Sequence, residues 1–253
     1  MTRKEKPVGL ALSGGGARGF AHLGVIQALQ EHGYNIKMLS GVSAGALAAV
    51  FFAAGYKPLE ILNFFLEKNY LKYFRLSIPN RGFVKNIALF KLMRDVLPER
   101  IEDLKIPTVI TVTNLNEGKV EYFSEGPLAR MVLASTSIPV IFQPVVYNNI
   151  SYVDGGVMNN LPVEPLRGKC RHIVASHVNP FSKQDKLESI LKVVERCFHL
   201  AIKENTERKK QLCTMYIEPE KLYHYKIFDF KKAPKLFDMG YEAAVKIIQE
   251  HKM

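Results

Sequence analysis

The sequence contains only three cysteines, Cys170, Cys197 and Cys213, an odd number without the close spacing of metal ligands. This pattern predicts reduced thiols and excludes a disulfide framework or a zinc motif. We expect neither a metal nor an organic cofactor. The chain also shows no internal repeat and no low-complexity linker.

A long apolar run is missing as well. The longest uncharged stretch, residues 39–56, is interrupted by serine and glycine and falls short of a membrane span. The first seven residues are short of apolar side chains, include four charged ones and lead directly into the first predicted strand. We therefore expect no signal peptide and a cytoplasmic protein. With 253 residues and 47% hydrophobic content, the chain is expected to bury one core as a single domain, residues 1–253.

Acidic residues are scarce relative to basic ones, and the net charge of +11 favours anionic partners. The span from Lys68 to Arg94 carries seven cations and no acid, interleaved with aromatic residues. Two interpretations stay open: a lid or contact on the inner face of an anionic membrane, or a helix surface with inward aromatics and solvated lysines. No RNP, zinc-finger or basic-helix motif accompanies these charges, so a nucleic-acid partner is not expected.

The predicted elements alternate between strand and helix. Strands are expected at 7–12, 35–41, 108–113, 120–123, near 145 and 152, at 172–177 and at 213–217. Helices are expected at 20–31, 46–55, 58–97, 127–134, 185–209 and from 234 onward. This alternation predicts an α/β fold with a mostly parallel sheet between helical layers.

The first predicted strand runs into a glycine-rich turn, with Gly14, Gly15, Gly16 and Gly19 before the helix. This turn matches the spacing of a dinucleotide-binding loop, which needs an acid at the end of the second strand. Residues 32–59 contain no Asp or Glu, so nucleotide binding is disfavoured. The backbone N–H groups of such a turn suit a negative charge, here a tetrahedral oxyanion.

The second predicted strand leads into Gly41-Val42-Ser43-Ala44-Gly45, which has the pattern of a nucleophile elbow. Glycine on each side permits a tight turn that exposes the Ser43 hydroxyl at the positive end of a helix. The alternative is a serine that merely caps that helix. Ser43 is our candidate nucleophile.

Two charged residues complete the candidate site. Arg18 lies in the first turn of a helix, against the helix dipole, and therefore asks for a compensating anion. A structural salt bridge and an anchoring role in the oxyanion loop both satisfy this requirement. Asp154 follows a predicted strand and precedes Gly155 and Gly156, which let the backbone approach another turn closely.

Together the motifs 14–19, 41–45 and 154–156 resemble, in order and spacing, the patatin-like phospholipases, a family of lipid acyl hydrolases. The similarity includes residues 134–145 and 159–163, is best over about 7–180, and is loose over 181–253. It implies a three-layer α/β/α sandwich with a mostly parallel central sheet and a lipid or fatty-acyl ester substrate.

The resemblance also implies a Ser–Asp dyad without histidine. Ser43 corresponds to the nucleophile, Asp154 to the general base, and Gly14, Gly15, Gly16 and Arg18 to the oxyanion loop. A free aspartate with a pKa of about 3.9 is a poor base, so burial is expected to raise the pKa of Asp154.

Two alternatives remain. A Ser-His-Asp triad would use His177 or His224, although only one strand and one helix precede Ser43, unlike the order in an α/β hydrolase. A non-catalytic lipid-binding or membrane-binding scaffold is disfavoured because both dyad residues are present.

Overall fold

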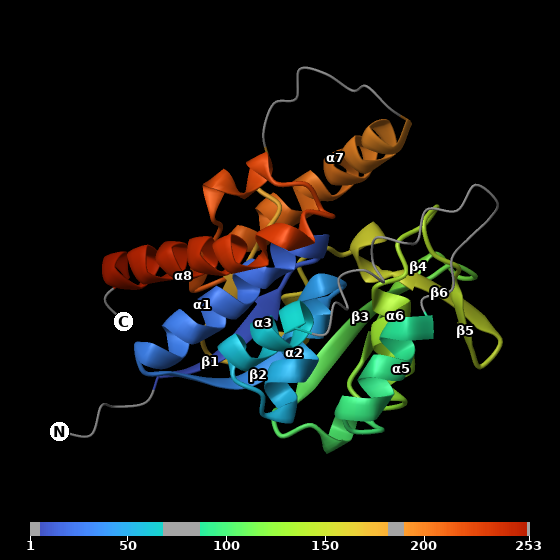
Figure 1. Ribbon diagram of the computed structural model, residues 1–253, viewed down its shortest axis with the longest axis horizontal. Helices are drawn as coiled ribbons and strands as arrows, with labels where there is room; N and C mark the ends of the chain where they lie inside the picture. The colour runs from blue at the N-terminus through green and yellow to red at the C-terminus, as the bar shows by residue number, and fades with distance from the viewer. Residues whose placement is uncertain (1–5, 68–86, 182–189, 252–253) are drawn as a thin grey trace.

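The computed structural model describes residues 6–67, 87–181 and 190–251 (Figure 1). Within these ranges eight strands form one sheet in the order β5-β6-β3-β2-β1-β7-β8, with β4 paired to β3. The strands are β1 (Lys6–Leu12), β2 (Tyr34–Val42), β3 (Thr108–Asn114), β4 (Lys119–Phe123), β5 (Val145–Tyr147), β6 (Ile150–Asp154), β7 (Ile173–Ser176) and β8 (Met215–Ile217).

The centre of the sheet is parallel, from β3 through β2, β1 and β7 to β8, whereas β4, β5 and β6 form an antiparallel edge. The helices are α1 (Phe20–Glu31), α2 (Ala44–Ala54), α3 (Pro58–Glu67), α5 (Ile87–Val96), α6 (Leu128–Ser135), α7 (Ile190–Lys210) and α8 (Ala233–Glu250). This is the mostly parallel α/β sandwich that the sequence predicted.

Side chains alternate across β1 and so separate the two faces of the sheet. Leu10 and Leu12 join the large core beneath α1, α2, α3, α5, α6 and α8. Ala11 faces a smaller core on the opposite side, where Leu161 and Leu166 of the connection before β7 cover the sheet. The helical face therefore holds most of the buried apolar surface.

Helices α1 and α8 lie side by side, although they come from opposite ends of the described chain (Figure 1). Gly24 of α1 faces the carbonyl oxygen of Phe237, and Gly240 of α8 faces that of Ala21. A Cβ at either glycine would overlap the facing carbonyl oxygen, so the two backbones pass in direct contact. Larger residues at these two positions would force the helices apart.

Two boundaries differ from those predicted around the elbow. β2 continues past Gly41 to Val42 because Val42 pairs with Thr111 of β3, and α2 begins at Ala44, before the predicted start at residue 46. Tertiary pairing extends the strand where local sequence gave no signal.

Most of the basic aromatic span, residues 68–86, lies outside the described residues. In its described remainder, α5 buries Leu92 and Met93 and exposes Lys91 and Arg94. This is the pattern of an ordinary amphipathic helix on a core, and membrane contact by the span stays a prediction. Within the described ranges no single helix has the length and apolar content to cross a membrane, and α2 and α3 pass such a test only as a pair bent by 116°.

Candidate active site

The sheet topology brings the sequence motifs to one place. β1 and β2 are parallel neighbours, so the turn after Leu12 and the turn after Val42 leave the same edge of the sheet. β3 pairs Thr111 with Val42, and β6 runs antiparallel to β3 with Asp154 opposite Val112. Asp154 therefore lies at the end of β6, and only β3 separates β6 from β2, the strand that leads into the Ser43 turn.

Ser43 occupies a strained position between β2 and α2, with φ of 54° and ψ of −123°. A non-glycine residue at positive φ is uncommon and costs on the order of 1–3 kcal/mol, so the surrounding structure must impose it. Its side chain caps no backbone N–H of α2, unlike a serine whose role is to cap a helix. The hydroxyl thus remains available for chemistry.

The conformation of Ser43 is held by Ser135 at the end of α6. The Ser135 hydroxyl accepts a hydrogen bond from the Ser43 N–H at 2.9 Å and donates to the carbonyl oxygen of Thr111 at 2.7 Å. Gly45 contributes by contact, because a Cβ there would overlap the carbonyl oxygens of Leu12 and Ser13. The elbow is therefore packed directly against the end of β1.

Asp154 is a buried carboxyl group beside this serine, with 4% of its surface exposed. Its Oδ1 accepts the Gly156 N–H at 2.8 Å. Burial raises the pKa of Asp154 from 3.8 to about 7, while hydrogen bonds from the Ser43 side chain and the Gly156 N–H act in the opposite direction. The expected elevation of this pKa by burial is present.

The glycine-rich turn forms a short 3-10 helix, η1 (Gly16–Gly19), that leads into α1. Gly14 lies against Ser43, because a Cβ on Gly14 would come within 3.2 Å of the Ser43 Cβ. The Gly14 N–H donates to the carbonyl oxygen of Asn160 at 3.2 Å. The N–H groups of Gly15 and Gly16 donate to no residue that the structure describes, which leaves both for an anion.

Arg18 is buried, and its contacts are with later parts of the chain. Its Nε donates to the carbonyl oxygen of Tyr225 at 2.7 Å and its Nη1 to Asn179 Oδ1 at 3.2 Å. Asn179 in turn donates from Nδ2 to the carbonyl oxygen of Gly14 at 2.5 Å. The guanidinium thus reaches the glycine turn through Asn179.

The remaining motif glycines lie where these turns meet. Gly41 is in β2, and Gly19 is in η1 with its Cα against Ala44. Gly155 and Gly156 begin another 3-10 helix, η3 (Gly155–Val157). The three sequence motifs are therefore one spatial cluster.

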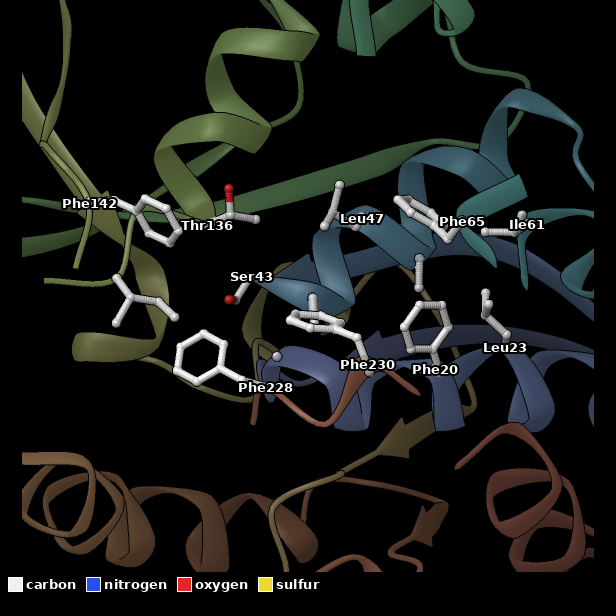
Figure 2. A pocket seen from close by; sticks show the side chains of 15 residues that line it. Phe20, Leu23, Ser43, Leu47, Ile61, Phe65, Thr136, Phe142, Phe228 and Phe230 are labelled. Carbon is white, nitrogen blue, oxygen red and sulfur yellow. The ribbon is translucent and has the colours of Figure 1, made fainter. Parts of the chain in front are cut away.

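An apolar pocket opens onto Ser43 (Figure 2). Apart from Ser43 and Thr136, every lining residue in the described chain is apolar or glycine. The lining residues are Gly16, Gly19, Phe20, Leu23, Ser43, Ala44, Leu47, Ala48, Ile61, Phe65, Thr136, Ile138, Phe142, Phe228 and Phe230. Such a lining suits a hydrocarbon chain.

The two histidines of the alternative triad make other contacts. His177 Nδ1 lies 2.6 Å from Glu218 Oε1, and the ring of exposed His224 packs on Tyr223. Neither is among the described residues that line the pocket at Ser43. The geometry therefore favours Asp154 as the partner of the serine.

Sequence reasoning did not identify His22, which is fully buried in α1. Burial lowers its pKa to about 4, so the ring is neutral at pH 7. Nε2 lies 2.8 Å from the Ser13 carbonyl oxygen and Nδ1 lies 2.8 Å from the Ser176 hydroxyl. A carbonyl accepts only, so Nε2 carries the proton and supports the start of the glycine turn. Its position on an apolar helix face gave no separate signal.

Lys209 at the end of α7 was also missed. Its ammonium group is buried and donates to Asn159 Oδ1 and, at 3.1 Å, to the Leu161 carbonyl oxygen. It also pairs with Glu164 at 2.9 Å. These contacts fix the loop between Asp154 and the carbonyl of Asn160 that binds Gly14.

A serine held at positive φ between a parallel strand and a helix, beside a buried carboxyl, has the geometry of a nucleophile elbow. A model of the patatin-like phospholipase family matches residues 10–167. The chain therefore belongs to this family, as the sequence motifs predicted.

Individual relatives agree with this assignment. An uncharacterized NTE family protein of Mycobacterium tuberculosis is 37% identical over 165 residues, which are 64% of this chain and 46% of the relative. Lysophospholipase NTE1 of Kluyveromyces lactis is 29% identical over 95% of this chain and 19% of its own length. This chain thus spans less than half the length of these relatives. The crystal structure of VipD from Legionella pneumophila has the same fold, with a TM-score of 0.55 and 18% identity over 98% of this chain and 67% of VipD.

Proposed function

We propose that this protein hydrolyses acyl esters of lipids through an acyl-enzyme on Ser43, with Asp154 as general base. The observation that carries the proposal is the hydrogen bond between Ser43, whose side chain lines the apolar pocket, and a buried Asp154 whose pKa is raised to about 7. A base with a pKa near the working pH combines a useful ionised fraction with a strong pull on the proton.

In the first half-reaction Asp154 takes the Ser43 hydroxyl proton as Oγ attacks the ester carbonyl. The carbonyl oxygen becomes a tetrahedral oxyanion, which we assign to the N–H groups of Gly15 and Gly16, because these donate to none of the described residues. We assign Gly14 and Arg18 to holding this turn in place, because their hydrogen bonds go to Asn160, Asn179 and Tyr225. Collapse of the intermediate expels the alcohol, which takes its proton from Asp154.

In the second half-reaction Asp154 takes a proton from water as the water attacks the Ser43 ester. The same N–H groups bind the second oxyanion, and Ser43 recovers its proton when the fatty acid leaves. A lysophospholipid is one candidate substrate, because the Kluyveromyces lactis relative is named a lysophospholipase.

A fluorophosphonate probe and a soluble p-nitrophenyl ester test this proposal together. Wild type should be labelled at Ser43 and hydrolyse the ester, whereas Ser43→Ala should lose both. Asp154→Asn should lower kcat by about a thousandfold or more while the protein stays folded. His177→Gln is the matched control, because His177 is buried like Asp154 but contacts Glu218. This variant should retain most activity. Loss of activity in folded His177→Gln, or full activity in Ser43→Ala, would contradict the dyad.

A further inference from the structure

The pocket extends to both sides of Ser43. Figure 2 shows Phe142 and Phe228 on one side of the serine, and Leu47, Phe230 and then the end of the pocket on the other. An ester bound with its carbonyl at Ser43 therefore has its acyl chain in one arm and its alcohol portion in the other.

The two arms differ in burial. The arm beyond Leu47 ends at Leu23, Ile61 and Phe65, which are 2%, 1% and 6% exposed. The opposite arm includes Phe228, which is only half-buried, beside buried Phe142. A flexible hydrocarbon chain gains most from the buried arm, and a polar alcohol portion loses least in the accessible one.

The buried end is rigid because its main ring is packed from three sides. The ring of Phe65 meets those of Phe20, Phe51 and Phe64 at centroid distances of 6.0, 5.3 and 5.6 Å. Edge-to-face contacts of this kind fix ring orientation. The wall of α1 and α3 therefore has no easy rotamer change by which to lengthen the pocket.

We propose that Leu23, Ile61 and Phe65 form an end wall that sets the longest acyl chain this protein accepts. The inference rests on the proposed esterase function and deepens it by assigning chain-length selection to three residues outside the sequence motifs. Ala44 and Ala48, one turn apart on α2, also line the pocket, and a larger side chain at either position would reduce the space for an acyl chain.

The test is kcat/KM on p-nitrophenyl esters from acetate to palmitate. For wild type, kcat/KM should rise with acyl-chain length to an optimum and then fall. Phe65→Leu should move the optimum to longer esters and raise kcat/KM for the first ester past the wild-type optimum about tenfold or more, as expected when an apolar pocket gains space. Leu23→Ala should move it in the same direction, and Ala48→Leu should move it to shorter esters.

Phe237→Leu is the matched control. Phe237 is 6% exposed, like Phe65, and belongs to the same core, but it is not among the described residues that line the pocket. This variant should share the stability loss of Phe65→Leu without its altered chain-length profile.

An unchanged optimum in folded Phe65→Leu and Leu23→Ala, with acetate hydrolysis and fluorophosphonate labelling retained, would overturn the end wall alone. An equal shift in Phe237→Leu would overturn it too. Wild type that neither reacts with the probe nor hydrolyses any ester would overturn the proposed function and this inference together.

Discussion

Residues 10–167, which match the family model, and the residues after 167 contribute different atoms to the site. The matched segment supplies all the motif residues, including Ser43 and Asp154. The later segment supplies groups that hold the turns: Asn179 and the Tyr225 carbonyl bind Arg18, and Lys209 binds the loop after Asp154. It also supplies Phe228 and Phe230 to the pocket wall.

In the proposed mechanism the motifs carry the chemistry, and the later residues hold them in position. Most of these contacts join residues far apart in sequence, such as Arg18 and Tyr225. Substitutions in the matched segment should therefore change the reaction itself, and those in the later segment should weaken it by degrees.

The largest effect should come from Asp154, whose carboxylate must be ionised to accept a proton. With a pKa of about 7, kcat/KM should rise with pH and level off above neutrality. Asp154→Asn should remove nearly all activity across this range. A flat pH profile in wild type would contradict the assignment of Asp154 as the base.

Asp154→Asn, which removes activity, should make the protein more stable than wild type at high pH. Between pH 4 and 7 the folded protein keeps the Asp154 proton, whereas the unfolded chain releases it near 3.8. The unfolded state then binds fewer protons, so stability falls as pH rises, by on the order of 4 kcal/mol. Asp154→Asn should escape this loss, and urea unfolding of both proteins at acid pH and at pH 8 measures the difference.

A smaller effect is expected for the link between the two segments at Arg18. Arg18→Ala should lower kcat by about a hundredfold and raise KM by less. The reason is that a displaced glycine turn aligns its N–H groups poorly with the oxyanion. Asn179→Leu should show the same split, since it removes the contacts to Arg18 and Gly14. Arg18→Lys should not restore activity, because the Nε and Nη1 bonds need the planar guanidinium.

Exposed Arg100, which pairs with Glu102, gives the matched control for Arg18. Arg100→Ala should leave kcat unchanged. If Arg18→Ala keeps full turnover but melts earlier, the arginine stabilises the fold without positioning the turn.

The smallest effect is expected at Lys209. Lys209→Met should cost about 1–3 kcal/mol, because Asn159 and the Leu161 carbonyl lose a buried donor, and it should lower kcat about tenfold. Lys210→Met, which removes the more exposed neighbour paired with Glu207, should cost less than about 1 kcal/mol. Equal losses in the two variants would remove Lys209 from the positioning network.

The sequence alone predicted the helix bounds and motifs that depend on local residue patterns. The helix 20–31 has the predicted bounds, because apolar spacing and the glycines before it mark both its face and its start. The three motifs were also predicted to act together, and parallel β1 and β2 bring the first two to one edge of the sheet.

The rest depends on contacts that no local pattern encodes. Asn179, His22 and Lys209 are ordinary residues of their elements until folding brings them to the glycine turn and the loop after Asp154. The Gly14 N–H donates to Asn160, whereas the N–H groups of Gly15 and Gly16 donate to nothing in the described part of the chain, and this difference likewise follows only from the folded loops.

The crossing of α1 and α8 has a consequence for biosynthesis. A nascent chain folds from its N-terminus as it leaves the ribosome, and α1 emerges long before α8. Until Gly240 reaches Ala21, the apolar side of α1 that α8 covers faces water, and the turn held by Tyr225 has no anchor. The residues proposed for catalysis are thus synthesised early, yet the ribosome must release the region around residue 240 before they can assemble.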